Sequence, residues 1–230
     1  MKKRTSFKHI FFDLDRTLWD YDQNVRDALK DLYTEFLDGK VVGDADTFIR
    51  VFLFENGRLW EKFTANKIDK KYLRDHRFLL TLRRMGLPDR NLGLQLEEAY
   101  MATTPAKQKL LPGVHEALEY LQKNYALHII TNGFEDAQQF KLSNSGIRDY
   151  FDHVVTSDAA GATKPNREIF LYSERVTGAR PDECLMIGDD ERADVHGAKR
   201  AGWQAIHFDP HSGENSDEKV SELLELTWRL

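Results

Sequence analysis

Short apolar runs alternate with amphipathic stretches over most of the chain. Five runs of four or five residues predict buried strands, because they are nearly continuous in apolar residues and end at turn-forming ones. The stretches between them repeat apolar residues every three or four positions, as helices do. The expected strands are His9–Phe12, Leu127–Thr131, His153–Thr156, Leu185–Gly188 and Ala205–Phe208, and the expected helices are Val114–Asn124, Asp136–Ser145, Arg167–Thr177 and Asp194–Ala201. This alternation predicts an α/β fold, a doubly wound, Rossmann-like parallel sheet covered on both faces.

Residues 21–110 break the alternation, because they contain helical stripes and no convincing strand. The stripes are Val25, Ala28, Leu29, Leu32, Tyr33 and Phe36, then Phe48, Val51 and Phe52, then Tyr72, Leu79, Leu82 and Met85. We expect these residues to form the core of a helical bundle. The predicted organisation is an α/β core domain made of residues 1–20 and 111–230, interrupted after its first strand by an all-helical domain at residues 21–110.

The C-terminal part of the chain predicts a loop followed by a helix. The polar stretch 209–217 is expected to be a mobile loop. After it, Val220, Leu223 and Leu224 fall on one face of a helix predicted over Ser216–Leu226.

Composition narrows the functional classes by exclusion. The 230 residues are 41% hydrophobic and 31% charged, which is typical of a globular protein. A net charge of −5 argues against binding a nucleic-acid polymer, whereas a small phosphorylated metabolite remains compatible. No stretch approaches the roughly 20 apolar residues of a membrane span, and the N-terminal apolar run is too short for a signal peptide. With Cys184 as the one cysteine, we expect a soluble cytoplasmic protein; its oligomeric state is not indicated.

Two carboxylates follow the first predicted strand in the stretch "DLDRT", namely Asp13 and Asp15. The carboxyl ends of parallel strands are where open α/β sheets place their ligands. Two carboxylates held this close repel each other unless they share a proton or bind a hard divalent cation. Alone, the motif also fits an ordinary loop in which one of the acids caps a turn.

Other polar motifs occur at the ends of later strands. Thr131-Asn132-Gly133 could donate several hydrogen bonds to one anion. Lys164-Pro165 is expected to open a helix, with the proline in its first turn and the lysine near its N-terminus. Each of these motifs is common in turns and helix starts, so one motif alone is weak evidence for a site. Their joint occurrence at strand ends is the evidence that indicates one.

A second acidic cluster follows the fourth predicted strand in the stretch "GDDERAD". It contains Asp189, Asp190 and Asp194. Like Asp13, these carboxylates follow the end of a predicted strand. Alone, an Asp-Asp pair in such a place is often a helix cap.

In the motifs "DLDRT", "ITNG", "KP" and "GDDERAD", the sequence resembles the haloacid dehalogenase (HAD) superfamily of phosphotransferases. The position of the insertion is similar to that of members with a C1 helical cap. The resemblance implies a phosphatase in which Asp13 is the nucleophile that forms an aspartyl-phosphate and Asp15 is the general acid and base. Lys164 would stabilise the charge of the reacting groups.

The resemblance also implies the ligands of the cofactor and of the phosphate. Mg²⁺ would be held by Asp13, the backbone carbonyl of Asp15 and Asp189, with Asp194 as a direct or water-mediated partner. Thr131, Asn132 and Lys164 would bind the phosphoryl oxygens.

The stretch from "ITNGF" through "GIRDYFD" to "KPNREIF" resembles the pyrimidine nucleoside 5′-monophosphatases, which implies a nucleoside monophosphate as substrate. The cap match is poorer, and specificity in these enzymes resides largely in the cap. Residues there that could contact a base are Trp19, Tyr21, Asn56, Arg58, Trp60 and Lys67. For each of them, a place in the core or on the solvated surface is the more common role.

Several alternatives remain open at the level of sequence. Within the same superfamily, these are a phosphatase for sugar phosphates or other small metabolites and a phosphosugar mutase. A phospho-accepting signalling domain also places acids and a lysine at strand ends, but it needs neither Asp15 nor a large helical insertion. A catalytically silent binding protein is disfavoured, because every expected catalytic residue type is present.

Overall fold

The computed structural model describes residues 7–212, 216 and 218–230. The chain divides into two compact units, one formed by Met1–Tyr21 with Gln108–Leu230 and the other by Asp22–Lys107. The first contains the sheet and is called the α/β unit. The second contains only helical elements within the part of the chain that is described and is called the helical unit. The α/β unit was expected to end its first segment at residue 20 and to begin its second at residue 111. The observed bounds differ from these by one and three residues.

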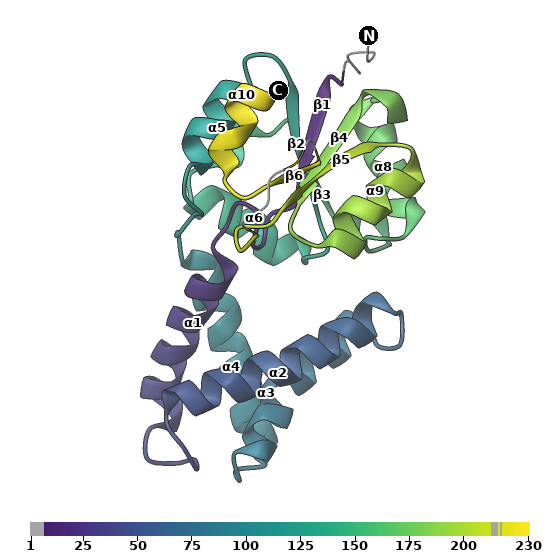
Figure 1. Ribbon diagram of the computed structural model, residues 1–230. Helices are drawn as coiled ribbons and strands as arrows, with labels where there is room; N and C mark the ends of the chain where they lie inside the picture. The colour runs from purple at the N-terminus through teal and green to yellow at the C-terminus, as the bar shows by residue number, and fades with distance from the viewer. Residues whose placement is uncertain (1–6, 213–215, 217) are drawn as a thin grey trace. The chain divides into compact units, whose positions relative to one another are not determined.

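The α/β unit is built on a sheet of six parallel strands in the order β3-β2-β1-β4-β5-β6 (Figure 1). The strands are β1 (His9–Phe12), β2 (Ala126–Thr131), β3 (His153–Thr156), β4 (Cys184–Gly188), β5 (Gln204–Phe208) and β6 (Lys219–Val220). Each of the five expected strands is present, with ends that agree to within one residue. The predicted Rossmann-like α/β fold with an all-helical insertion is therefore confirmed.

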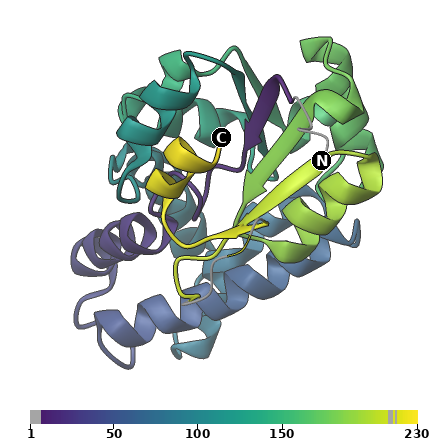
Figure 2. The same cartoon turned by 45° about the horizontal axis from the view of Figure 1, so that its top comes forward.

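Helices cover both faces of this sheet, as the two views in Figures 1 and 2 show. The helices α5 (Val114–Leu121) and α10 (Leu226–Arg229) lie on one face, and α8 (Arg167–Thr177) and α9 (Gly197–Ala201) lie on the other. The short α7 (Ser157–Ala160) follows β3, and α6 (Glu135–Asn144) connects β2 to β3. Phe11 and Ile130 of the sheet are fully buried in one cluster with Phe170 of α8. This apolar layer holds the strands in place.

The register of the strands brings the candidate residues to one edge. Phe12, the last residue of β1, lies opposite Ile129 of β2 and Ile187 of β4. The loops that follow β1, β2 and β4 therefore leave the sheet at nearly the same level. This is the edge where an open parallel sheet places its ligands.

The helix predicted over Ser216–Leu226 is wrong. Lys219 and Val220 instead form β6, which pairs with His207 and Phe208 of β5. Val220 is fully buried, and its carbonyl accepts a hydrogen bond from Asp209 N–H (2.9 Å). The edge of β5 thus gains backbone partners that a helix could not supply. A 3₁₀ turn over Leu223–Glu225 and then α10 follow. Of the loop expected at 209–217, residues 213–215 and 217 lie outside the described residues.

Two helix starts also differ from the expectation. The segment predicted as a helix from Asp194 begins earlier, with a π-helical turn over Glu191–His196 that leads into α9. Asp190 caps this turn by accepting hydrogen bonds from the N–H groups of Arg192 and Ala193. Pro165 does not lie in the first turn of α8, because that helix begins at Arg167 after the cap residue Asn166.

The helical unit contains most of α1 (Tyr21–Leu32), together with α2 (Ala45–Thr64), α3 (Lys70–Arg84) and α4 (Arg90–Thr103). A π-helical turn over Tyr33–Leu37 follows α1 and adds one residue to the repeat. Leu37 is consequently buried where the α-helical spacing predicted Phe36. Tyr72, expected in the core, is exposed, because the buried face of α3 carries Leu73, Arg77, Phe78, Thr81 and Leu82.

No helix in the described part of the chain is both long enough and apolar enough to span a membrane.

Candidate active site

Asp13 lies at the carboxyl end of β1, beside β4. Its N–H donates a hydrogen bond to the carbonyl of Ile187 (2.9 Å), so the backbone still follows the sheet at this point. The chain then turns sharply, and the N–H groups of Leu18 and Trp19 donate to the Leu14 carbonyl. Arg16, inside the turn, has a φ of 65°. This turn separates the two carboxylates, so that Asp13 lies in the buried centre and Asp15 lies nearer to α6.

Lys164 is at the centre of the buried charges. Its Nζ lies 2.7 Å from Asp13 Oδ1, 2.7 Å from Asp194 Oδ1 and 2.7 Å from the carbonyl oxygen of Ile130. The lysine is 2% exposed and Asp194 1% exposed. An ammonium surrounded by oxygens in this way holds a fixed position, and it links the segments that follow β1 and β4 to the end of β2.

Three carboxylates form one acidic group at this edge. Oxygen atoms of Asp13, Asp189 and Asp194 all lie within 4.8 Å of one another. The close approach of Asp194 requires a glycine at position 188, because a Cβ there would lie 2.1 Å from Asp194 Oδ2. The same oxygen accepts a hydrogen bond from Asp190 N–H (3.1 Å).

The electrostatics of the group follow from burial and crowding. Burial raises the pKa of Asp13 well above its ordinary value, and the charges of Asp194 and Asp189 add to this effect, while Lys164 opposes it. Burial and the charge of Asp194 raise the pKa of Asp189 to about 6. Burial opposes the charge on Lys164, but Asp13 and Asp194 outweigh it, so the pKa of Lys164 lies above its ordinary value. One ammonium therefore does not neutralise the acidic group.

This donor set fits a divalent cation such as Mg²⁺. Carboxylate oxygens are the hard ligands that such a cation prefers, and three of them already lie within the span of one coordination shell. The positive charge would also offset the repulsion that raises the pKa of Asp13 and Asp189. The residues that could hold it are Asp13, Asp189 and Asp194; the role expected for the Asp15 carbonyl stays a prediction.

Asp15 contacts two side chains of α6. Lys141 Nζ lies 2.6 Å from its Oδ1, and Gln138 Nε2 lies 3.1 Å from its Oδ2. Gln138 Nε2 also lies 2.8 Å from Thr131 Oγ1 at the end of β2. The acid expected to transfer protons and the hydroxyl expected to bind phosphate thus share a partner.

Asn132 has a different set of contacts from the one expected. Its Oδ1 accepts a hydrogen bond from the N–H of Lys164 (2.6 Å), and its Nδ2 donates one to the Lys164 carbonyl (3.0 Å). The side-chain amide is therefore paired with the backbone that carries the lysine, and it orients Lys164 toward Asp13. Direct binding of phosphoryl oxygens by Asn132 stays a prediction.

The sequence reasoning did not identify Thr17, Gln138 and Lys141 as site residues. Thr17 Oγ1 accepts a hydrogen bond from Asp189 N–H (3.1 Å) and so joins the first acidic loop to the second. The sequence did contain an indication for Gln138 and Lys141. With Ser145, these polar residues lie three or four positions from Leu142, on the helix face that is buried. Polar residues at core-facing positions indicate a site rather than a core.

The aromatic and polar residues considered for base recognition have varied surroundings. Trp19 is fully buried, and Lys141 Nζ lies 4.3 Å from the centre of one of its rings. Asn56 is also buried, and Arg58 forms an ion pair with Glu55 (3.6 Å). Trp60 and Phe63 pack edge to face at 5.5 Å. Burial leaves Trp19 and Asn56 with little surface for a ligand.

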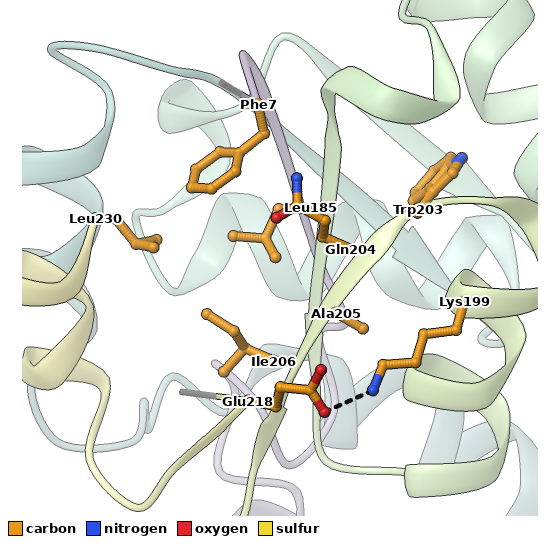
Figure 3. A pocket seen from close by; sticks show the side chains of 9 residues that line it. All are labelled: Phe7, Leu185, Lys199, Trp203, Gln204, Ala205, Ile206, Glu218 and Leu230. Carbon is orange, nitrogen blue, oxygen red and sulfur yellow. Dashed lines mark hydrogen bonds and ion pairs between the residues drawn. The ribbon is translucent and has the colours of Figure 1, made fainter. Parts of the chain in front are cut away.

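A pocket of about 380 Å³ lies elsewhere in the α/β unit (Figure 3). None of the predicted site residues lines it. Its walls include Leu185 of β4 and Ile206 of β5, and an ion pair between Lys199 and Glu218 (2.8 Å) lies at one side. It is separate from the acidic group described above. Its lining is Phe7, Leu185, Lys199, Trp203, Gln204, Ala205, Ile206, Glu218 and Leu230.

The chain is similar over most of its length to several proteins of known name. Pyrimidine 5′-nucleotidase YjjG of Escherichia coli (strain K12) is 32% identical over 210 residues, which are 90% of this chain and 88% of the relative. Glyceraldehyde 3-phosphate phosphatase of Methanothermobacter thermautotrophicus is 30% identical over 202 residues, 86% of this chain and 84% of the relative. The crystal structure of HAD-hydrolase YfnB from Bacillus subtilis bound to magnesium superimposes with a TM-score of 0.85 at 26% identity, covering 96% of this chain and 97% of that chain.

The family assignment rests on nearly the whole chain. Residues 7–202 match the haloacid dehalogenase-like hydrolases, and the relatives with curated names include phosphatases of two substrate types. The chain therefore belongs to the haloacid dehalogenase-like hydrolase family.

Proposed function

We propose that the protein is a magnesium-dependent phosphate monoester hydrolase that works through an aspartyl-phosphate, with pyrimidine nucleoside 5′-monophosphates as its preferred substrates. The observation that supports this reaction most directly is the buried Lys164 between Asp13 and Asp194, with Asp189 beside them and Asp15 two residues beyond Asp13. This arrangement unites a nucleophile, a fixed positive charge and a second carboxylate that can transfer protons.

In the first step, an oxygen of Asp13 forms a bond to phosphorus as the bond to the leaving oxygen breaks. Asp15 gives that oxygen its proton, so an alcohol departs. Lys164 stays 2.7 Å from Asp13 Oδ1 and orients the carboxylate for attack. The Thr131 hydroxyl, at the end of β2, donates to a phosphoryl oxygen and stabilises the charge in the transition state.

In the second step, Asp15 removes a proton from water, and the water oxygen attacks the phosphorus of the aspartyl-phosphate. The acyl-phosphate bond breaks, Asp13 regains its carboxylate, and inorganic phosphate leaves. Mg²⁺, when bound by Asp13, Asp189 and the Asp15 carbonyl with help from Asp194, supplies positive charge that allows the two anions to meet.

The preference for pyrimidine nucleotides is supported by the relative that is named a pyrimidine 5′-nucleotidase and by the matching stretch from "ITNGF" to "KPNREIF". A relative of nearly equal identity is named a glyceraldehyde 3-phosphate phosphatase, and it supports the second candidate, a phosphatase for small sugar phosphates. We assign the helical unit the role of a cap that selects among substrates. The cytoplasmic location expected from the sequence stays a prediction.

A substrate panel with Mg²⁺ tests the proposal. The panel holds UMP, dUMP, dTMP, the purine monophosphates, glyceraldehyde 3-phosphate and hexose phosphates, and kcat/KM is measured for each. We expect the highest values for the pyrimidine nucleotides, with Asp13→Asn inactive throughout. Equal values across the panel, or a preference for the triose phosphate, would reject the nucleotidase. Conversion of a hexose phosphate into its isomer would instead identify a mutase, and a stable phosphoenzyme without turnover a signalling domain.

A further inference from the structure

Lys141 of α6 places a buried ammonium against the carboxylate of Asp15. The lysine is 6% exposed, and its Nζ lies 2.6 Å from Asp15 Oδ1. The ammonium also lies 4.3 Å from the centre of a ring of Trp19 and 5.8 Å from that of Tyr21. Aromatic faces attract a cation and exclude water from it. The carboxylate and the aromatic rings together hold the ammonium, and Oδ1 of Asp15 is held with it.

Gln138 lies one helical turn before Lys141 and is fully buried. Its Nε2 lies 3.1 Å from Asp15 Oδ2 and 2.8 Å from Thr131 Oγ1. A carboxamide nitrogen carries two hydrogens, so one donates to each oxygen. The amide packs over the backbone of Gly133, where a Cβ would lie 1.9 Å from Nε2. A glycine at this position is thus required for Gln138 to reach both partners.

These contacts also determine how the hydroxyl of Thr131 can act. Its Oγ1 accepts one hydrogen bond from Gln138 Nε2 and a second from the N–H of Gly133 (3.1 Å). A hydroxyl oxygen has two lone pairs, and both are then occupied. The O–H hydrogen is left to donate, which is the form that binds an anionic phosphoryl oxygen.

Burial of these groups is costly for the fold. A buried ammonium and a buried amide lose their hydration, and Gln138 Oε1 has no hydrogen-bond partner among the described residues. An apolar pair at the same two positions of α6 would fill the space without this cost. The arrangement therefore points to a role in the reaction rather than in stability.

We propose that Gln138 and Lys141 are positioning residues for proton transfer and phosphate binding. Lys141 anchors Oδ1 of Asp15, which leaves Oδ2 as the oxygen that carries the proton. Gln138 sets the distance between that oxygen and the Thr131 hydroxyl and keeps the hydroxyl as a donor. This inference rests on the proposed function and concerns residues outside the four motifs.

The test compares monophosphates whose leaving groups differ. The variant Lys141→Met is assayed with p-nitrophenyl phosphate, whose leaving group needs little protonation, and with phenyl and alkyl phosphates, whose leaving groups need more. We expect kcat/KM to fall about 100-fold for the alkyl ester and less than about 10-fold for p-nitrophenyl phosphate, because Asp15 protonates the leaving oxygen. The inhibition constant of inorganic phosphate should change less than about 2-fold, since Lys141 does not touch Thr131. Lys199→Met, which removes an exposed ion pair, is the matched control.

Gln138 is expected to show a different pattern. In Gln138→Met, the leaving-group dependence should appear together with weaker binding of inorganic phosphate, by about 10-fold, because the Thr131 hydroxyl is no longer held as a donor. Gln139→Met is the matched control, since the amide of this neighbouring residue donates to Glu135 Oε1 (2.9 Å) rather than to Asp15 or Thr131. Both controls should match the wild type.

The outcomes separate this inference from the proposed function. Loss of turnover in Asp13→Asn, with an active wild type, tests the phosphatase alone, and the aryl and alkyl esters do not depend on nucleotide preference. Equal losses for all leaving groups, or the same change in phosphate binding in both variants, would overturn the positioning roles. Where Lys141→Met does not fold, Lys141→Arg keeps the charge but moves the donor away from Oδ1. It should show the same leaving-group pattern in a weaker form, and its absence would equally overturn the proposal.

Discussion

The two units of the protein bury charge in different proportions. In the helical unit, the guanidinium of Arg77 donates two hydrogen bonds, of 2.6 and 2.7 Å, to the carboxylate of Glu97. In the α/β unit, the ammonium of Lys164 contacts Asp13 and Asp194, and Asp189 lies within the same acidic group. Both clusters are largely buried. The Arg77–Glu97 pair brings together charges of opposite sign, whereas the acidic group beside Lys164 contains three carboxylates.

This difference separates a structural ion pair from a site. The Arg77–Glu97 pair is bidentate, and the guanidinium also lies 4.4 Å from the centre of the Tyr100 ring, so the charges satisfy one another. The excess of carboxylates around Lys164 raises the pKa of Asp13 and Asp189 and attracts a further cation. A buried charge imbalance that the fold maintains is a better indicator of function than buried charge alone.

The largest expected effect comes from removing one member of the unbalanced cluster. Asp13→Asn should lower kcat by at least about 10⁴-fold, because the carboxylate that we propose as the nucleophile is lost. The free energy of unfolding should fall by less than about 1 kcal/mol, since one of the repelling carboxylates is removed while Lys164 keeps Asp194. Steady-state kinetics and thermal unfolding measure the two quantities. Turnover near the wild-type rate would remove Asp13 as the nucleophile.

Replacing one member of the Arg77–Glu97 pair should instead lower the stability of the fold. Arg77→Met leaves Glu97 buried without its partner, so the free energy of unfolding should fall by about 3–5 kcal/mol. The double replacement of Arg77 and Glu97 by Met should be more stable than either single variant, because no unpaired charge remains. Denaturant titration gives these values. A double variant less stable than both single ones would contradict the comparison.

Mg²⁺ should stabilise the folded protein through the acidic group around Lys164. At 100 times its dissociation constant, an ion that binds the folded acidic group as we propose should raise the free energy of unfolding by about 2.7 kcal/mol. In Asp189→Asn the increase should be much smaller, whereas Gln139→Met should keep all of it. Thermal unfolding with Mg²⁺ and with EDTA measures the shift. An equal shift in Asp189→Asn would place the cation elsewhere.

The smallest expected effect concerns a buried group that remains neutral. Burial, followed by the charges of His9 and His153, lowers the pKa of His128 to about 3. In the unfolded chain this imidazole binds a proton near pH 6.5, whereas in the folded protein it stays neutral until about pH 3. The free energy of unfolding therefore falls as the pH is lowered from about 6.5 toward 3, by up to about 1.4 kcal/mol per pH unit.

In His128→Val this loss should be absent. Relative to the wild type, the variant should therefore gain about 2 kcal/mol between pH 7 and pH 5. His9 Nδ1 lies 3.0 Å from His128 Nε2, so His9→Asn serves as a second variant that keeps the buried ring. Parallel stability curves for the wild type and His128→Val would show that His128 does not limit acid stability.

Much of the α/β unit could be predicted from local pattern. The strands β1 and β3 match their predicted bounds, because a continuous apolar run that ends at an acid or a turn has few other solutions in a parallel sheet. The position of Asp13 at the end of β1 follows from that strand alone. In the helical unit, the spacing of apolar residues predicted the buried face of α1 equally well. No local sequence pattern predicted the π-helical turn that places Leu37 in the core.

The features that the local pattern did not predict have a common cause. Whether Lys219 and Val220 join a helix or a strand depends on the open edge of β5, which is formed by residues about a dozen positions away. The contacts of Asn132 are likewise absent from the local pattern, because its side-chain amide pairs with the backbone of Lys164, 32 residues away. Such choices depend on neighbours that the local pattern does not contain.

The sequence by itself determined the order of the strands and of the helical insertion along the chain. It also determined which residue types follow the strands and which family these motifs resemble. The tertiary structure alone decided how these groups are paired. It set Lys164 between two carboxylates, joined Thr17 to Asp189, and brought Gln138 and Lys141 to Asp15 from more than 120 residues along the chain. The physical reason is that residue types follow from local chemistry, whereas hydrogen-bond partners and the pKa of a buried group depend on which atoms the fold brings within a few ångströms.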